Sequence, residues 1–179
     1  MLFSSMTFIY VFLPIVLLLY LVTKKELHNP ILLAASIIFY AWGEPRYLAI
    51  MLLTILVNYL GALGVEKYEK HKKPILILAI LVNLGFLFYF KYFNFMIENI
   101  NSIFHFDISL LKIVMPIGIS FYTFQAMSYL IDVYRSEVKA QKDIYKLALY
   151  ICLFPQLVAG PIVKYHDIEE QINSRDVNF

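Results

Sequence analysis

The chain has 179 residues, of which 61% are hydrophobic and 16% charged, and its formal net charge is +2. Soluble domains contain about 45–50% apolar residues, so the composition argues against a soluble globular protein, and the small charge gives no indication of a nucleic-acid partner. Cys152 is the only cysteine, which excludes a disulfide within the chain.

Six stretches of 17 to 23 residues contain no Asp, Glu, Lys or Arg. They cover residues 1–23, 27–43, 47–65, 74–90, 113–131 and 147–163. A helix of about 20 apolar residues crosses the roughly 30 Å hydrocarbon layer of a bilayer. The sequence therefore predicts an all-α, polytopic integral membrane protein with about six apolar membrane segments. The first stretch has neither a preceding basic residue nor a small-residue cleavage site, so we expect a retained helix.

Basic residues occupy every second connector between these stretches. Lys24 and Lys25 follow the first, residues 66–73 contain four lysines, and residues 135–146 contain one arginine and three lysines. Basic connectors stay in the cytoplasm, so we expect a multi-pass protein of the cell membrane with an extracytoplasmic N-terminus. The block at 66–73 also admits a second interpretation, as a docking patch for lipid headgroups or protein.

The stretch around residues 115–135 carries the most unusual polar pattern. At 100° per residue, Gly118, Gln125 and Asp132 lie within about 20° of one another, with Tyr122 and Ser128 on the same side. A glutamine facing lipid would have unsatisfied hydrogen bonds, so we expect this side to face protein or a wet cavity. The polar groups either join neighbouring helices or line the cavity.

The same projection places Ile119, Met127 and Ile131 nearer to lipid. Asp132 is expected to be hydrated or paired with Arg135, three residues later. In the other apolar stretches, Asn58 and Asn83 are expected to form hydrogen bonds between helices.

The last apolar stretch contains Pro155, Gln156, Gly160 and Pro161. Proline removes a backbone donor and the Gly-Pro pair ends a helix. Broken backbone at membrane depth persists only where protein or water satisfies it. We therefore predict a broken or re-entrant segment whose four residues line the cavity, followed by a polar amphipathic or surface tail at 164–179.

No catalytic, cofactor-binding or metal-binding residue is predicted. The four histidines, His28, His71, His105 and His166, lie in connectors or in the tail, and no two have the spacing of a metal-binding pair.

Three segments together resemble the membrane-bound O-acyltransferase family, in its alginate O-acetyltransferase branch. They are residues 40–45 (YAWGEP), residues 115–135, and residues 154–165 (FPQLVAGPIVKY); residues 3–14 fit the same branch. The resemblance runs the length of the chain. Lys164 stands where the family usually has arginine, a mild departure.

The resemblance implies transfer of an acyl group, usually acetyl, across the membrane to hydroxyls of an extracellular polysaccharide. It implies a ring of helices around a funnel, with an essential histidine in the second half of the family pattern. Residues 1–179 would then be the N-terminal part of one multi-pass domain, inactive alone. An extracytoplasmic hydrolase-like acetyltransferase is the implied partner, and the acyl donor and acceptor polymer stay open.

Two other interpretations remain. Six crossings with one discontinuous helix also suit half of a secondary transporter. An inert protein fragment is the third interpretation.

Overall fold

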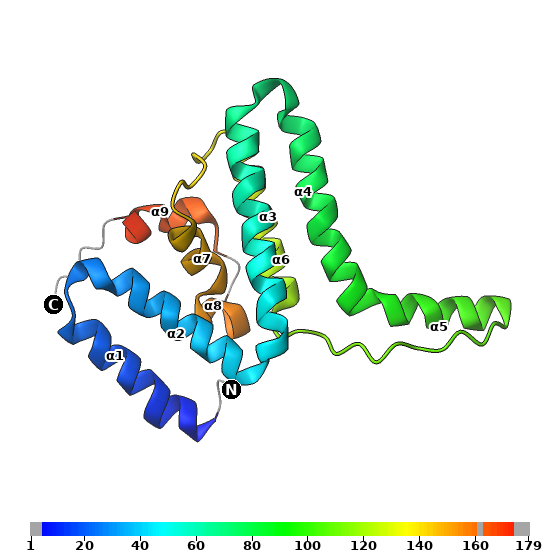
Figure 1. The fold of residues 1–179 in the computed structure, drawn as a ribbon, viewed down its shortest axis with the longest axis horizontal. Coiled ribbons are helices and arrows are strands. Elements are labelled where there is room, and N and C mark those ends of the chain that lie inside the picture. The colour runs from blue at the N-terminus through cyan, green and yellow to red at the C-terminus, as the bar shows by residue number, and fades with distance from the viewer. Residues whose placement is uncertain (1–4, 161–162, 174–179) are drawn as a thin grey trace.

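The computed structural model describes residues 5–160 and 163–173, and within these ranges the chain forms helices and no strand (Figure 1). The α-helices are α1 (Leu13–Val22), α2 (His28–Gly43), α3 (Leu48–Lys67), α4 (Lys72–Leu87), α5 (Phe93–Phe104), α6 (Ile119–Tyr134), α7 (Ile144–Cys152), α8 (Phe154–Ala159) and α9 (Tyr165–Asn173). The prediction of an all-α fold is confirmed.

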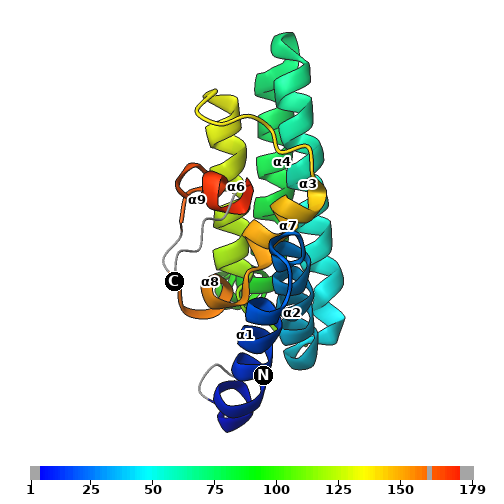
Figure 2. The same cartoon turned by 90° about the vertical axis from the view of Figure 1, so that its left-hand side faces the viewer.

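Helices α3, α4 and α6 pack together as the longer layer of the fold (Figures 1 and 2). Asn58 on α3 and Asn83 on α4 donate to each other's side-chain oxygens, at 2.9 and 3.1 Å, and neither is exposed. The predicted pairing of these asparagines is confirmed. A Cβ atom at Gly61 would lie 3.2 Å from the Ala79 Cβ and 3.3 Å from a methyl of Leu130, so α3 approaches both neighbours closely.

Helices α1, α2, α7 and α8 form the second part of the fold, with α2 between α1 and α7. Four phenylalanine rings pack with centroids 5.5 to 6.1 Å apart and join α2 and α8 to the N-terminal helix: Phe8, Phe12, Phe39 and Phe154. Aromatic packing at these distances adds to the stabilisation from burial.

An arm projects sideways from the end of α4, as Figure 1 shows in green. A π-helical turn at Phe88–Tyr92 leads into α5, and residues 105–118 return beside α5 without helical structure. The side chains of Asn94 and Asn101 hold this return. Each donates to and accepts from the backbone of one residue, Leu111 and Ile108 respectively, at 2.7 to 3.1 Å.

The arm changes two predicted boundaries. Residues 91–111 lie between two of the apolar stretches and were therefore expected to form a connector, but residues 91–104 continue the helix from α4. Residues 113–118 were expected to begin a membrane segment, but α6 starts only at Ile119 because Pro116 and the left-handed Gly118 interrupt the backbone.

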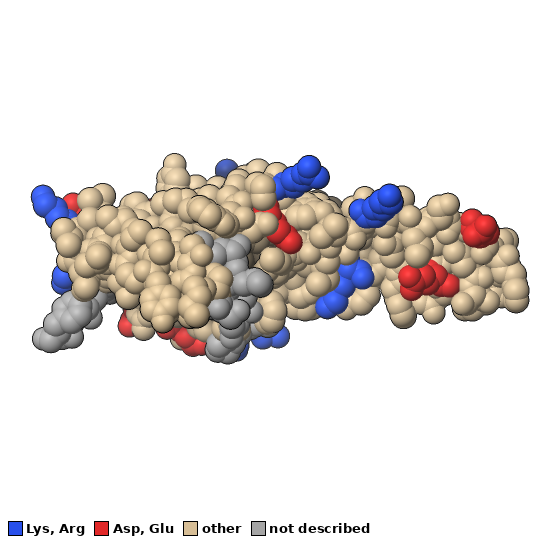
Figure 3. Space-filling view, turned by 90° about the horizontal axis from the view of Figure 1, so that it is seen from below, with Lys and Arg blue, Asp and Glu red and all other residues tan. Residues whose placement is uncertain are grey.

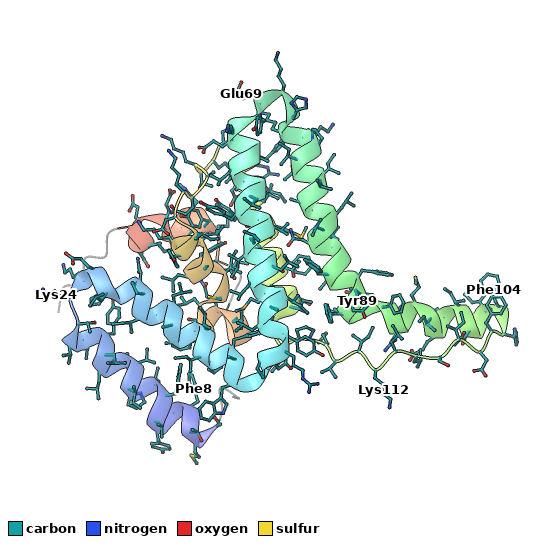
Figure 4. The ribbon with its side chains drawn as sticks, viewed as in Figure 1. Phe8, Lys24, Glu69, Tyr89, Phe104 and Lys112 are labelled. Atoms are coloured by element: carbon teal, nitrogen blue, oxygen red, sulfur yellow. The ribbon has the colours of Figure 1, made fainter. Side chains whose placement is uncertain are left out.

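Two continuous helical runs are long and apolar enough to cross a membrane, Pro45–Lys67 and Glu69–Phe104, and Phe8–Val22 is a shorter apolar run. This search covers only the described part of the chain. The turns that carry Lys24 and Glu69 both lie above Phe8 in Figure 4. The fold fits a membrane protein.

Candidate functional site

The three segments that carry the family resemblance meet at one end of α6. The carboxylate of Glu44, just after α2, accepts a hydrogen bond of 2.9 Å from the backbone N–H of Ile117. These residues are 73 positions apart, so the contact joins the YAWGEP segment to the entry of α6. Phe39, Tyr40, Gly43, Glu44, Ile117 and Leu157 line a small hollow of about 10 Å³ there. That volume is close to the minimum for one water molecule.

Gly118 brings the start of α6 against α8. Its φ of 74° lies in the left-handed region, which side chains other than glycine's rarely adopt. A Cβ atom on this residue would lie 2.8 Å from the backbone oxygen of Leu157 and 3.1 Å from the Leu157 Cγ. Glycine is therefore needed here both for the backbone conformation and for the close approach.

Gln125 joins α6 to the broken segment. Its side-chain nitrogen donates to the backbone oxygen of Tyr150 at 2.7 Å and to the side-chain oxygen of Gln156 at 3.2 Å. Gln125 is buried and Gln156 half-buried. The backbone breaks at Leu153, between α7 and α8, and Pro155 is the second residue of α8. The predicted break in residues 147–163 is confirmed, and a side-chain amide on α6 satisfies the last turn of α7.

Tyr40 and Tyr122 place two hydroxyl groups beside this junction. Both side chains are buried, and neither hydroxyl has a hydrogen-bond partner among the described atoms. The two hydroxyls are near enough to influence each other electrostatically, and the Glu44 carboxylate influences both. Unsatisfied buried hydroxyls are uncommon in proteins, and these two lie beside each other.

Asp132 lies at the other end of α6, past the apolar stretch, with one carboxylate oxygen unpartnered among the described atoms. Burial, and then the nearby Glu137 carboxylate, raise the pKa of the Asp132 carboxyl. Lys164, Arg135 and His166 oppose this shift to a smaller extent. The ion pair of Arg135 is with Glu137, at 3.9 Å. The predicted Asp132–Arg135 pair is therefore not formed, and the prediction that Asp132 is hydrated is wrong, since only 4% of its surface is exposed.

The remaining predicted site residues lie on the same two elements. Ser128 is half-buried on α6, Pro155 is exposed at the start of α8, and Gly160 follows α8 directly. A Cβ atom on Gly160 would lie 2.8 Å from the Gln156 Cα. Pro161 lies outside the described residues. Gly118, Gln125 and Asp132 all face protein, as predicted, and Gly118 and Gln125 contact neighbouring helices.

The prediction for the lipid-facing side of α6 is wrong for Ile119. Ile119 is only 1% exposed, whereas Phe121 and Phe124 are 43% and 44% exposed. Met127 and Ile131 are half-buried. The helical projection failed because α6 contacts α3, α4, α7, α8 and α9, which cover most of its circumference.

A tyrosine cluster at the polar end of the site was not predicted. The rings of Tyr129, Tyr150 and Tyr165 lie 5.0 to 6.5 Å apart, and Gln141 binds two of them. Its backbone N–H donates to the Tyr129 hydroxyl at 2.8 Å, and its side-chain nitrogen donates to the Tyr165 hydroxyl at 2.7 Å. This cluster connects α6, α7 and α9. Buried tyrosine hydroxyls usually have a hydrogen-bond partner. The tyrosines in the apolar stretches could therefore have indicated that polar partners lie nearby.

The described residues of the site supply amides, phenolic hydroxyls and carboxylates. They contain no group of three or more His, Cys, Asp or Glu side chains that could hold a metal ion. The site is built from helix ends, one carboxylate–backbone bond, amides and phenolic hydroxyls.

The all-helical fold and its two long apolar helices are consistent with a membrane protein. Curated relatives indicate which kind of membrane protein the chain resembles. The chain is 40% identical over 184 residues to the probable alginate O-acetylase AlgI of Pseudomonas putida, which covers 98% of this chain and 38% of the relative. It is 39% identical to the protein of the same name from Pseudomonas aeruginosa, covering 98% of this chain and 35% of the relative.

A peptidoglycan O-acetyltransferase of Helicobacter pylori is 30% identical over 210 residues, covering the whole chain and 40% of the relative. No family model and no solved structure matched. The chain is thus homologous to the N-terminal part of the alginate O-acetylases, in the membrane-bound O-acyltransferase family, and the resemblance is confirmed. The chain spans between 34% and 40% of the length of these relatives.

Proposed function

We propose that this chain is the N-terminal scaffold of a membrane O-acetyltransferase that modifies hydroxyls of an extracellular polysaccharide or of peptidoglycan. The observation that carries the proposal is the meeting of the three family segments through Glu44–Ile117, Gly118–Leu157 and Gln125–Gln156. The named activities of the relatives, alginate O-acetylation and peptidoglycan O-acetylation, supply the reaction class.

In this proposal the chain crosses the membrane about six times, with α7 and α8 as the broken sixth segment. The junction of α2, α6 and α8 forms part of the cavity wall. Gly118, Tyr122, Gln125, Ser128, Asp132, Pro155, Gln156, Gly160 and Pro161 are its proposed lining. The general base that activates the acceptor or the acyl carrier comes from chain beyond residue 179. An extracytoplasmic hydrolase-like acetyltransferase receives or delivers the acyl group.

The test is acetylation of the polymer in a strain lacking the full-length protein. Residues 1–179 expressed alone, beside the extracytoplasmic partner, are expected to give no acetyl ester. Co-expression with a matching C-terminal half is expected to restore it. Acetyl ester formed by residues 1–179 alone would contradict the proposed placement of the catalytic groups.

A secondary transporter remains the alternative, because a discontinuous helix such as α7–α8 also occurs in transporter repeats. Downstream sequence separates the two. A second set of crossings with a matching broken helix favours the transporter, and a membrane segment with an isolated histidine favours the acetyltransferase.

A further inference from the structure

The arm formed by α5 and the return has an apolar side that no described part of the chain covers. Met96 and Ile103 are 38% and 68% exposed, and they lie within about 20° of each other around α5. Asn94 and Asn101, which hold the return, lie on the opposite side of this helix. Ile97, on the side of the return, is only 7% exposed. The return therefore covers one side of α5 and leaves the side of Met96 and Ile103, the open side of the arm, uncovered.

Two contacts hold the arm in its direction where it leaves α4 through the π-helical turn Phe88–Tyr92. The Lys91 ammonium donates to the Ser120 hydroxyl of α6 at 3.3 Å, and the rings of Phe90 and Tyr47 pack edge to face with centroids 5.8 Å apart. In Figure 1, α4 rises on one side of α5 and the return lies on the other. The open side of the arm therefore faces the space beside α4.

An exposed apolar surface runs along α4 toward the arm. Leu78, Leu81 and Leu84 are 65%, 60% and 40% exposed, and Phe88, where the π-helical turn begins, is 42% exposed. These residues belong to the run Glu69–Phe104, which is long and apolar enough to cross a membrane. If α4 crosses the bilayer, this surface meets the acyl chains, and the open side of the arm begins where the crossing ends.

Charged side chains lie on the other side of the arm. Figure 3 views the arm from the side of the return and shows charged groups of both signs along it, and in Figure 4 the Lys112 side chain points away from α5. Residues 88–112 contain two basic and two acidic residues, Lys91, Lys112, Glu98 and Asp107, so their formal charges cancel. Apolar contact, and not attraction to anionic headgroups, therefore determines what the arm binds.

We propose that the arm is an in-plane membrane anchor whose open side lies in the extracytoplasmic leaflet. An amphipathic helix in this position buries its apolar side about 5–10 Å into the boundary between headgroups and acyl chains. Tyr89 and Tyr92, at the root of the arm, are 45% and 43% exposed, and tyrosine is enriched at this depth. The lipid leaflet is the occupant that continues the surface along α4. The proposal rests on the membrane crossings in the proposed function and does not depend on acetyl transfer.

The test is spin labelling of the full-length protein, in a cysteine-free background, in vesicles of phosphatidylethanolamine and phosphatidylglycerol. Nitroxides are attached after Met96→Cys or Ile103→Cys on the open side, and after Asp107→Cys or Lys112→Cys in the return. Oxygen dissolves preferentially in acyl chains, whereas a nickel chelate stays in water. We expect the ratio of oxygen to nickel collision rates to be several-fold higher at 96 and 103 than at 107 and 112. Phosphatidylcholine in place of phosphatidylglycerol should leave these ratios unchanged, because the charges of the arm cancel.

Leu78→Cys on α4 and Tyr68→Cys at the basic turn are the controls for lipid and for water. Low collision rates with both reagents at 96 and 103 would mean that protein covers the open side, and high nickel rates there would mean that water does. Either result, with oxygen favoured at position 78, would overturn the anchor alone. A position 78 that does not favour oxygen would overturn the membrane crossings of the proposed function as well. Thermal unfolding of each labelled variant establishes that the fold is intact.

Discussion

Asn58 and Asn83 bond to each other through both amide groups, and each also donates to a backbone oxygen four residues earlier in its own helix. Replacing one of them by leucine leaves the other amide buried without its partner, whereas replacing both leaves no amide that requires a partner. Hydrogen bonds between membrane helices contribute about 0.6–2 kcal/mol. We expect the free energy of unfolding of each single variant to fall by about that amount. The double variant should lose less than the sum of the two single losses. Unfolding in mixed detergent micelles measures all three, and strict additivity would contradict the pairing.

Gly118 is the position where substitution should be most damaging at the candidate site. Gly118→Ala combines a left-handed backbone, costing about 1–2 kcal/mol, with a contact of 2.8 Å to the Leu157 oxygen. Gly85→Ala is the control, because no atom lies within 4 Å of its Cβ position and alanine is the better helix former. The Gly118 variant should unfold at a lower temperature than the parent and the Gly85 variant should not. Equal unfolding temperatures would show that α8 does not pack against Gly118.

Asp132 should make stability depend on pH. Its raised folded-state pKa means that its stabilising contribution is complete below the unfolded-state pKa of about 3.9. The contribution is lost as the pH rises through the folded-state pKa, so the ionised carboxylate is unfavourable at neutral pH. We expect Asp132→Asn to raise the unfolding temperature at pH 7 and the gain to shrink on acidification. Asp107→Asn, at an exposed residue of the arm, is the control, and a gain independent of pH would contradict this assignment.

At the scale of elements, the arm depends on its two asparagine contacts. Removing either side chain by Asn94→Ala or Asn101→Ala deletes two hydrogen bonds, each contributing about 0.5–1.5 kcal/mol. The amides of Leu111 or Ile108 should then exchange with deuterium faster, while α3 and α4 remain unchanged. Asn99→Ala is the control, since Asn99 bonds only within α5, to the Phe95 oxygen. Unchanged exchange in residues 105–112 of both variants would mean that other contacts hold the return.

Most helices were predictable because long apolar stretches have few alternatives to helical structure in a membrane. The arm could not be predicted in the same way, because hydropathy does not distinguish a helix from non-helical chain. Residues 93–104 contain enough polar side chains to suggest a connector, yet they form α5, and residues 113–118 are apolar but not helical. For residues 113–118, Pro116 and Gly118 were the sequence signals that a helix could not begin earlier. For α5, the deciding contacts come from Asn94 and Asn101 to residues that follow in sequence.

The composition of the candidate site was predictable and its contacts were not. Helical periodicity correctly placed Gly118, Gln125 and Asp132 toward protein, but it could not identify what they face. The Gln125 partners lie 25 and 31 positions away, and the partner of Glu44 lies 73 positions away. Such distances are determined by tertiary packing, which a projection of one helix omits. The same omission explains the error at Ile119, which neighbouring helices cover.

At the scale of the whole molecule, the two parts of the fold meet along α3, which contacts α7, and along α6. The layer of α3 and α4 packs on one side of α6, and α7, α8 and α9 pack on another. Gln125 and the tyrosine cluster of Tyr129, Tyr150 and Tyr165 tie α6 to the second part through buried polar groups. Gln125→Leu in the full-length protein should therefore loosen α7 and α8, lowering polymer acetylation while leaving α3 and α4 protected from hydrogen exchange. Faster exchange in α3 and α4 would instead indicate a general loss of folding.

The orientation of the molecule in the membrane is testable with single cysteines in a Cys152→Ser background. We expect the turn at Tyr68, whose side chain is 52% exposed, to face the cytoplasm because four lysines lie in residues 66–73. The arm begins near Tyr89, at the end of α4 opposite Glu69 (Figure 4), and its tip should face outward. We choose Ser102 and not Asn101 as the cysteine position there, because the Asn101 side chain forms two hydrogen bonds with the Ile108 backbone. An impermeant maleimide applied to intact cells should label Ser102→Cys and not Tyr68→Cys, and permeabilised cells should label both. Labelling of Tyr68→Cys in intact cells would reverse the orientation, together with the predicted extracytoplasmic N-terminus.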